Sequence, residues 1–219
     1  MDLSVVIPTL NAALTLPGTL ASIARVPREI IVADGGSSDD TAAIAHDFGC
    51  RVIPAPRGRG SQLAAGVAEA RAAWLLLLHA DTRLAPGWAE VVARHMGGPP
   101  GRAGYFRFRL DDEARAARRL ERAVAWRCRV LGLPYGDQGL LVSQALLRAV
   151  GGIRPLPLME DVDLVRRIGR RRLVGLEADA VTSAERYRRD GYLRRSARNL
   201  AILGLWFAGV PPRLLARLY

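Results

Sequence analysis

The chain has 219 residues, of which 50% are hydrophobic and 24% charged, so it is long enough to bury a sizeable core as one domain. That apolar content excludes a disordered chain, and the ordinary numbers of glycine and proline, 22 and 13, exclude collagen-like and low-complexity classes. With only two cysteines, Cys50 and Cys128, a disulfide framework and a cysteine-rich zinc module are excluded too, which indicates a reducing, intracellular setting.

The net charge of +11 comes from the second half of the chain. Residues 1–100 carry a net charge of −1 and residues 101–219 carry +12, and all 32 basic residues are arginine, which also fits a coding bias. From Arg186 onwards there are 8 arginines and one acid, Asp190. Such a segment is either a solvated surface or a surface for nucleic acid, an anionic membrane or an anionic substrate.

Neither a targeting segment nor a membrane span is expected. Asp2 stands where a signal peptide has basic residues, and no stretch reaches the roughly 20 apolar residues of a span. The apolar run Leu200–Val210 fits an interfacial helix on an anionic membrane, a contact that liposome pelleting tests, or a helix docked on the core or at a dimer interface. We therefore expect a cytoplasmic protein, with peripheral contact to the inner membrane as one alternative for residues 186–219.

Strand and helix signals alternate through the first hundred residues. Short apolar runs predict buried strands, and the amphipathic stretches between them predict helices, the second of which is capped by Asp39. The predicted strands are Leu3–Ile7, Glu29–Ala33, Arg51–Ile53 and Trp74–His79, and the predicted helices are Leu16–Arg25, 40–48, Ser61–Ala72 and Pro86–His95. This alternation predicts an α/β fold with a mostly parallel, Rossmann-like sheet and helices on both faces.

The alternation weakens after residue 100. We predict a strand over Gly104–Leu110, a long arginine-rich helix over Asp112–Leu131, and a loop that enters a strand over Tyr135–Val142. A short helix to Val150, an irregular segment rich in glycine and proline, and a helix over Asp161–Gly169 follow. The whole reads as a single domain with a C-terminal helical tail.

Polar residues follow three of the predicted strands, and ligands of open parallel sheets bind beyond the carboxyl ends of the strands. The three segments are Pro8–Asn11, Asp34–Thr41 and His79–Thr82. Asp34 can accept hydrogen bonds from a base or ribose, although capping loops explain the acids after it. Asp81 can hold a divalent cation that keeps most of its waters, or can close a turn on its own backbone.

Other signals are less specific. Gly58-Arg59-Gly60 lacks the third glycine of a dinucleotide fingerprint, so Arg57, Arg59 and Gln62 are either nucleotide contacts or ordinary surface. A chain without lysine has no Walker A motif, and no G-x-S-x-G elbow occurs. The acids of the segment Met159–Asp163 point either to catalysis or to ion pairs with the arginines that follow on the same helix.

Together these segments resemble the family 2 glycosyltransferases, with their nucleotide-diphospho-sugar-binding GT-A fold. The resemblance covers nearly the whole chain up to about residue 195, with the motifs in the family's order. The matching stretches are Ser4–Asn11, Ile30–Thr41, Arg57–Gly66, Leu75–Thr82, Gly136–Gly139 and Gly151–Asp161. The short chain, with H-A-D-T and G-D-Q-G, resembles a small bacterial subgroup.

The resemblance implies an inverting transfer from a nucleotide-diphospho-sugar, with UDP as the first expectation and GDP next, to an acceptor hydroxyl. Asp161 of the pair Glu160-Asp161 resembles the catalytic base, because single displacement needs a carboxylate that takes the hydroxyl proton. Asp81 resembles the aspartate that binds Mg²⁺ or Mn²⁺, a cation that offsets the charge of the departing diphosphate. The other implied nucleotide-sugar contacts are Pro8, Thr9, Asn11, Asp34 (to the base), Gly36, Arg59, Gln62 and Ala80, and the implied acceptor-side residues are Asp137 and Gln138.

The family pattern assigns residues 1–195 to the glycosyltransferase domain, with 1–100 as the nucleotide-sugar-binding half and 101–195 as the acceptor-side half. Residues 196–219 then form an amphipathic helical tail. Two positions depart from the pattern: His79 stands at the first acid of D-x-D, and Gly35 at the second acid of D-D-G-S.

Two other functions stay open on the sequence. A sugar nucleotidyltransferase shares this type of sheet, but it needs a glycine-rich loop with a basic residue after strand one, which Thr9-Leu10-Asn11 lacks. A protein that binds nucleic acid or another anionic surface would use the arginine-rich half, with an affinity that falls steeply with salt. That function gives no role to Asp34, Asp81 and Asp161, so no nucleic-acid partner is expected.

Overall fold

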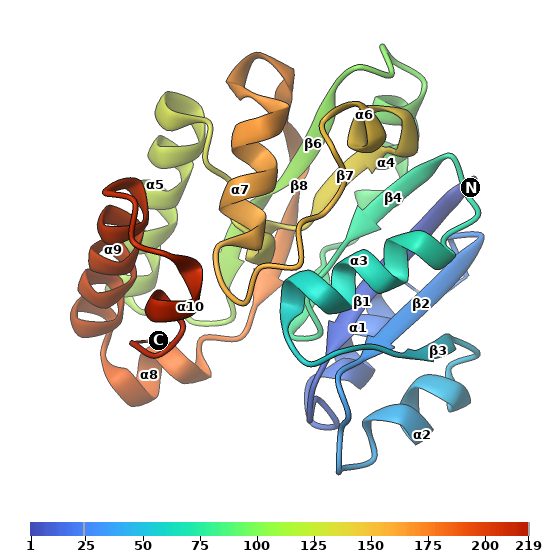
Figure 1. The fold of residues 1–219 in the computed structure, drawn as a ribbon, viewed down its shortest axis with the longest axis horizontal. Helices are drawn as coiled ribbons and strands as arrows, with labels where there is room; N and C mark the ends of the chain where they lie inside the picture. The colour runs from blue at the N-terminus through green and yellow to red at the C-terminus, as the bar shows by residue number, and fades with distance from the viewer. Residues whose placement is uncertain (24, 219) are drawn as a thin grey trace.

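A mixed β-sheet lies between layers of helices in the computed structural model, which describes residues 1–23 and 25–218 (Figure 1). Within these residues the sheet has eight strands in the order β3-β2-β1-β4-β7-β6-β8-β5. The strands are β1 Leu3–Thr9, β2 Glu29–Asp34, β3 Arg51–Pro54, β4 Trp74–Leu77, β5 Thr82–Leu84, β6 Ala103–Leu110, β7 Leu140–Ser143 and β8 Leu173–Thr182. The helices are α1 Leu16–Ile23, α2 Thr41–Asp47, α3 Arg59–Glu69, α4 Trp88–Met96, α5 Arg115–Leu131, α6 Gln144–Ala149, α7 Glu160–Ile168, α8 Glu185–Asp190, α9 Tyr192–Phe207 and α10 Pro212–Leu215, with 3₁₀ turns η1 Gly136–Gln138 and η2 Arg170–Arg172.

The first four strands of the sheet order form its parallel half. Strand β1 pairs with β2 and β4, and β2 pairs with β3, all in parallel. The register places Thr9 beside Asp34 and Val6 beside Leu77. The carboxyl ends of these strands therefore meet at one edge of the sheet, as the sequence predicted.

The second half of the sheet is mixed. Strand β7 runs antiparallel to both β4 and β6, β8 runs parallel to β6, and β5 runs antiparallel to β8. Four of the seven pairings are thus parallel, which confirms the predicted α/β class with a mostly parallel sheet.

Alternate residues of β1 divide the core between the two faces of the sheet. Val5 and Ile7 pack with side chains of α1 and α4, whereas Val6 packs on the other face with α3, α6 and α7. All three side chains are fully buried. Because burying an aliphatic side chain of this size contributes about 1.5–3 kcal/mol, strands buried on both faces supply much of the stability.

Two strands, β5 and β8, were not predicted. The inward residues of β8 are Leu176, Ala178, Ala180 and Thr182, so this strand lacks the run of Val and Ile that marks a buried strand. Asp179 on its outward face accepts a hydrogen bond from Arg107 of β6 at 2.8 Å. The strand is therefore held by its pairing with β6 and by cross-strand charge more than by its own propensity.

The predicted cap of α2 is shifted by one residue. The helix begins at Thr41 with Asp40 in the cap position and no hydrogen bond from the Asp40 side chain. Asp39 instead accepts hydrogen bonds from the Thr41 N–H, at 3.1 Å, and from the Ala13 N–H, at 3.1 Å. Its carboxylate thus joins two loops as well as facing the helix.

The C-terminal segment packs on the body of the molecule. Helix α9 continues across residue 195, and its residues Arg195, Ile202 and Leu203 are buried, as is Leu215 of α10. The opposite side of α9 leaves apolar side chains such as Leu200 exposed. Contact of that side with an anionic membrane stays a prediction. In the described parts of the chain, no helix combines the length and apolar character needed to cross a membrane.

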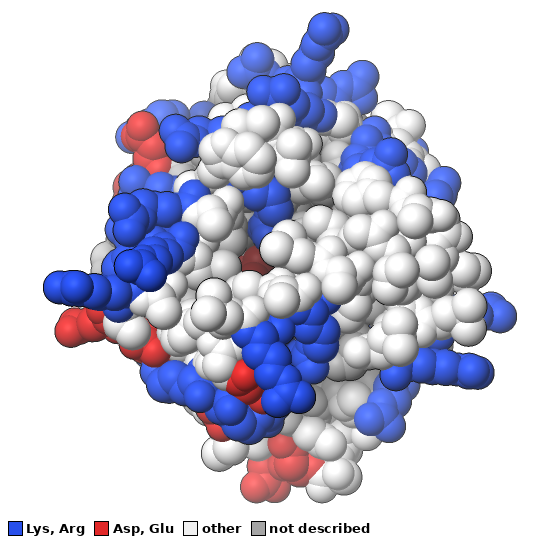
Figure 2. Space-filling model, turned by 90° about the vertical axis from the view of Figure 1, so that its left-hand side faces the viewer, with Lys and Arg blue, Asp and Glu red and all other residues white. Residues whose placement is uncertain are grey.

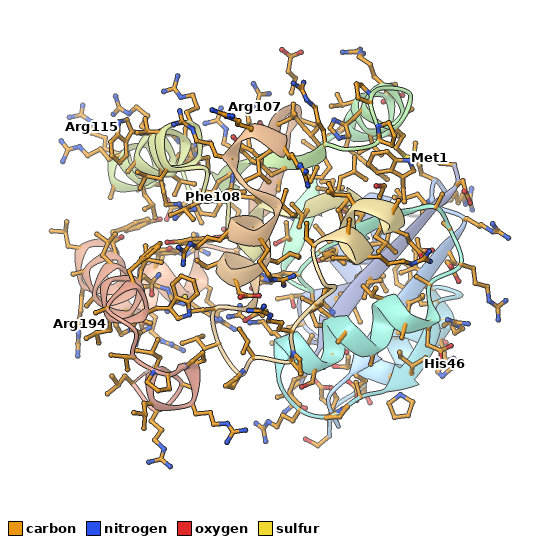
Figure 3. All side chains as sticks on the ribbon, turned by 45° about the horizontal axis from the view of Figure 1, so that its top comes forward. Met1, His46, Arg107, Phe108, Arg115 and Arg194 are labelled. Carbon is orange, nitrogen blue, oxygen red and sulfur yellow. The ribbon has the colours of Figure 1, made fainter. Side chains whose placement is uncertain are left out.

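Arginine side chains crowd the side of the molecule that carries α5, α8 and α9. Figure 2 shows them around an area of uncharged residues with a hollow at its centre, and acidic atoms lie at the bottom of that hollow. Arg115 on α5 and Arg194 on α9 point outwards into solvent (Figure 3). Part of the positive charge of the second half of the chain is therefore displayed on this side.

Candidate active site

A groove of about 560 Å³ lies along the carboxyl ends of β1 and β4. Seven of the nine residues predicted to contact a nucleotide-sugar line it. They are Pro8, Thr9, Asn11, Arg59, Gln62, Ala80 and Asp81. The sequence motifs thus meet in space although they come from three separate segments, and we call this cavity the donor groove.

Asp34 lies next to the donor groove but does not line it. Its Oδ2 accepts the N–H groups of Gly36 and Ser37 at 3.0 and 2.8 Å, and its Oδ1 accepts the hydroxyls of Thr9 and Ser37. A carboxylate has about four acceptor positions, so the protein itself uses all of them. Asp34 therefore holds the two loops together, and its predicted contact with a base would require one of these bonds to be exchanged.

Two further predicted contacts brace the groove as well as line it. The Asn11 Oδ1 accepts the N–H of Ser38 at 2.9 Å, and Asn11 adopts φ 51°, a left-handed conformation that asparagine tolerates. The buried Gln62 side chain donates to the carbonyl oxygens of Thr9 and Ala33. A Cβ built on Gly35 would lie 3.1 Å from the Gln62 Nε2, so a larger residue at this departure from the family pattern would crowd that amide.

A smaller pocket of about 130 Å³ adjoins the donor groove, and we call it the inner pocket. Its walls come from the ends of β4 and β8, from η1 and the start of α7, and from α8 and α9. Six residues line both cavities: Arg59, His79, Asp81, Leu158, Ser183 and Arg186. A molecule in the groove and a second molecule in the pocket would therefore touch at this junction.

Asp161 presents its carboxylate to the inner pocket. Oδ2 accepts the N–H of Gly136 at 2.8 Å, and Oδ1 accepts the N–H of Val162 at 2.7 Å. These two bonds fix the orientation of the carboxylate and leave further acceptor positions unused. The preceding Met159 has φ 65°, a strained conformation that such sites often contain.

Glu160, predicted with Asp161 as a catalytic pair, is buried and does not line the inner pocket. Its Oε1 lies 3.1 Å from the Arg59 Nε, and its side chain is 1% exposed. Burial and the neighbouring Asp161 raise the pKa of Glu160 to about 7, although Arg59 opposes the rise. In the structure it pairs with Arg59, and its part in catalysis stays a prediction.

The raised pKa of Glu160 predicts a pH dependence of stability. Because the folded pKa of about 7 lies above the ordinary glutamate pKa of 4.5, this carboxyl stabilises the fold fully below about pH 4.5, and its contribution is lost as the pH rises through 7. In Glu160→Gln this loss is absent, so the urea midpoint should fall less between pH 4.5 and 7.5 than in the wild type. If the urea midpoints of wild type and Glu160→Gln change with pH in the same way, the raised pKa of Glu160 is contradicted.

His79, at the first acid position of the D-x-D motif, is held neutral. Burial, reinforced by Arg59, lowers its pKa to about 4 despite the nearby Asp81 and Asp161. Its ring lies against Gly136, where an added Cβ would come within 2.4 Å of Nε2. The negative groups at this junction are therefore aspartates, and glycine at position 136 is what allows the imidazole to approach.

The two predicted acceptor-side residues have different surroundings. Asp137 lines the inner pocket, and burial raises its pKa to about 6 although Arg127 opposes the rise. Gln138 does not line the pocket, because its Nε2 donates to the Phe106 carbonyl at 3.0 Å and its Oε1 accepts the Tyr135 N–H at 3.3 Å. The structure therefore leaves Asp137 available to a ligand and makes Gln138 part of the core.

Asp81 is the predicted metal ligand. Its carboxylate lines both cavities and forms no hydrogen bond or salt bridge with the residues that the structure describes. In this part of the chain there is also no group of three or more His, Cys, Asp or Glu side chains that could hold an ion. A Mg²⁺ ion fits such a site, because it keeps several waters and binds one or two carboxylates together with substrate phosphates.

Sequence reasoning took the segment Thr182-Ser183-Ala184, with Arg186 and Tyr187 after it, as part of the family resemblance, but it gave no role in the site to the wall that β8, α8 and α9 contribute. Ser183, Arg186 and Tyr187 line the inner pocket together with Asn199 and Ile202. Arg186 forms no salt bridge with the described residues, so an uncompensated cation stands at the junction. A lone arginine after an unpredicted strand gave a weak signal, and Asn199 reaches the pocket only through the packing of α9.

Comparisons with known proteins agree with this geometry. The model of the family described as "Glycosyl transferase family 2" matches residues 4–144. A PGL/p-HBAD biosynthesis glycosyltransferase of Mycobacterium tuberculosis is 42% identical over 101 residues, which cover 42% of this chain and 39% of that protein. A glycosyltransferase of Mycobacterium bovis, named as uncharacterized, is 39% identical over 85 residues, with 38% of each chain covered. The matches thus span about two fifths of the length of these relatives.

Solved structures share the fold. Glucosyl-3-phosphoglycerate synthase from M. tuberculosis, in complex with Mn²⁺, UDP and glucosyl-3-phosphoglycerate, superposes with a TM-score of 0.55 at 22% identity, covering 83% of this chain and 70% of that one. Residues 1–349 of Staphylococcus aureus TarS, in complex with UDP, give a TM-score of 0.62 at 16% identity, covering 84% and 62%. At these identities the similarity establishes the architecture alone.

Proposed function

The chain belongs to glycosyl transferase family 2, and from this premise we propose that it moves a sugar from a nucleotide-diphospho-sugar to an acceptor hydroxyl, with inversion at the anomeric carbon. UDP is the nucleotide we propose first, because the two solved structures named above hold UDP. The nucleotide lies in the donor groove along Pro8, Thr9 and Asn11, and the sugar reaches the junction with the inner pocket.

Asp161 is the proposed base of the transfer. It accepts the proton of the acceptor hydroxyl while the acceptor oxygen forms a bond to the anomeric carbon. The bond from that carbon to the diphosphate breaks, and its electron pair leaves with the nucleoside diphosphate. Attack from the face opposite the leaving group inverts the configuration, so one carboxylate in the inner pocket suffices.

Positive charge at the junction stabilises the departing diphosphate. Arg59, anchored by the buried Glu160, and Arg186 both line the donor groove next to Asp81. A divalent cation held by Asp81 supplies further charge to the same oxygens when it is bound.

The observation that carries this proposal is the junction between the two cavities. A groove lined by the family's nucleotide motifs opens at Arg59 and Asp81 into a pocket that contains the Asp161 carboxylate. An enzyme that joins two substrates needs this arrangement, because the reacting atoms of both must approach within about 3–3.5 Å. A protein that only binds an anionic surface does not.

A thermal-shift panel of UDP, GDP, CDP and dTDP, each with and without Mg²⁺ or Mn²⁺, tests the donor side. A ligand at 100 times its Kd adds about 2.7 kcal/mol, which raises the Tm of a chain of this size by about 5–10 °C. We expect one nucleotide, UDP, to give this shift in a cation-dependent way. Asp81→Asn should lose the cation dependence, whereas the exposed Asp47→Asn on α2 should behave as wild type.

A flat panel on folded protein would contradict the proposal. Asp34→Ala is a poor probe for this experiment, because that substitution removes four hydrogen bonds that hold the loops beside the groove. A loss of nucleotide binding in that variant would therefore not separate contact from support.

A further inference from the structure

The outer wall of the inner pocket is built by the C-terminal helices. Tyr187 of α8 lines the pocket together with Arg195, Asn199 and Ile202 of α9. Arg195 and Ile202 are buried, and the neighbouring Leu203 packs with side chains of α3, α6 and α7 on one face of the sheet. The segment that looked like a tail in the sequence is thus a structural part of the site.

This wall is held rigidly. The Tyr187 ring stacks on Tyr192 with centroids 5.3 Å apart, and the Arg195 guanidinium lies 5.3 Å from the Tyr187 ring. Arg195 pairs with Asp190 at 2.9 Å, which neutralises its charge, and the Tyr192 hydroxyl donates to Asp112 at 2.8 Å. The pocket therefore presents an aromatic ring fixed by its neighbours, and the charge of Arg195 beside that ring is balanced by Asp190.

Two residues that line the inner pocket each carry a buried oxygen atom without a hydrogen-bond partner among the described residues. The Asn199 Oδ1 and the Asp137 Oδ1 are buried and accept no hydrogen bond from the described residues. Both residues line the pocket that contains Asp161. A buried acceptor without a donor costs about 1–3 kcal/mol, so these atoms are suited to a ligand that brings hydrogen-bond donors.

We propose that α8 and α9 form the acceptor subsite and that the acceptor is a small polyhydroxylated molecule, a monosaccharide or a polyol. One hydroxyl meets Asp161, and others donate to the oxygens of Asn199 and Asp137. A volume of about 130 Å³ is below the 300–1,000 Å³ of pockets for drug-sized ligands, which favours a small acceptor. Tyr187 contributes apolar ring atoms to the wall that would lie beside the C–H groups of such a molecule. This inference rests on the proposed function and names its second substrate.

Ligand-observed saturation-transfer NMR, with UDP and Mg²⁺ present, tests the subsite. The probes are glycerol, myo-inositol, glucose and mannose, with ethyl 4-hydroxybenzoate as an aromatic comparator. Wild type should transfer saturation to at least one of the four polyhydroxylated probes. Asn199→Leu, which removes the acceptor oxygen at similar volume, should weaken that binding about tenfold, whereas Asn199→Asp, which keeps an acceptor oxygen, should retain it. Arg194→Ala, on the solvent side of the same helix, serves as the control and should bind as wild type.

The Tm of each apo variant separates a ligand contact from a structural role. Replacing an unpaired buried amide by an apolar side chain of the same shape is neutral or stabilising, so Asn199→Leu should not melt earlier than wild type. The proposal is overturned if Asn199→Leu binds the probes as wild type does, or if UDP-bound wild type takes up only the aromatic comparator or no probe. Absence of any Tm shift by nucleotides would instead overturn the proposed function itself, because the donor groove does not contain Asn199.

Discussion

Replacing Asp161 by asparagine is expected to lower kcat by about 10²–10⁴-fold, the usual contribution of a general base, while UDP still raises the Tm of the variant. The substitution keeps the shape of the side chain and one oxygen for the Gly136 N–H, but it removes the group that accepts the hydroxyl proton and the bond from the Val162 N–H. Release of UDP in the presence of donor and acceptor, followed with saturating substrates, measures the loss.

Asp163, two residues further along α7, is the matched control for that experiment. Its carboxylate pairs with Arg154 at 3.0 Å and with Arg167 at 2.7 Å, and it does not line the inner pocket. Asp163→Asn should therefore keep kcat close to the wild-type value per folded molecule. Equal losses of kcat in the two variants would falsify the assignment of Asp161, because they would point to a common disturbance of the helix.

Asp163→Ala is expected to have the largest effect on stability. The Asp163 and Arg167 side chains are 11% and 16% exposed, and removing one partner of a buried pair costs about 3–5 kcal/mol. Arg154 is 58% exposed and returns to water, so the lower end of that range applies. At about 2–4 °C per kcal/mol for a chain of this size, the Tm should fall by at least about 6 °C.

Urea unfolding of the Asp163→Ala variant and of Arg28→Ala provides the comparison. Arg28 pairs with Asp2 at 3.1 Å, but both side chains are more than half exposed, and such surface pairs contribute little. We expect the urea midpoint to fall much further in Asp163→Ala than in Arg28→Ala. Equally small changes in the two variants would show that the pairs of Asp163 with Arg154 and Arg167 do not stabilise the fold.

The sequence predicted the parts of the fold whose signals are local. Runs such as Val5-Val6-Ile7 can only be buried strands, and the motifs that follow them necessarily meet at one edge of a parallel sheet. Strand β8 escaped prediction because small residues, among them Ala178 and Ala180, fill its inward positions. The extended conformation of β8 depends on its pairing with β6, and the sequence of β8 alone does not reveal that pairing.

The site residues, too, were predicted where their sequence signals are local and were missed where tertiary packing places them. Asp161 and Asp81 were predicted as site residues from their place after predicted elements and from the family resemblance, and the structure brings both to the pocket. Gln138 looked equally polar, yet whether an amide faces a cavity or the core depends on side chains such as Phe106 that approach from elsewhere in the chain. Asn199 lies on a helix whose rotation is set by tertiary packing, so its role has no local signature.

The order of the wall and groove along the chain has a consequence for how such enzymes diversify. The donor groove is lined mainly by residues 8–81, whereas four residues of the outer wall line the inner pocket and not the groove: Tyr187, Arg195, Asn199 and Ile202. If the proposed acceptor subsite is correct, changes at these four positions alter which acceptor fits and leave the nucleotide loops as they are. Divergence in acceptor preference can therefore proceed by substitution within two helices, against a background of unchanged donor chemistry.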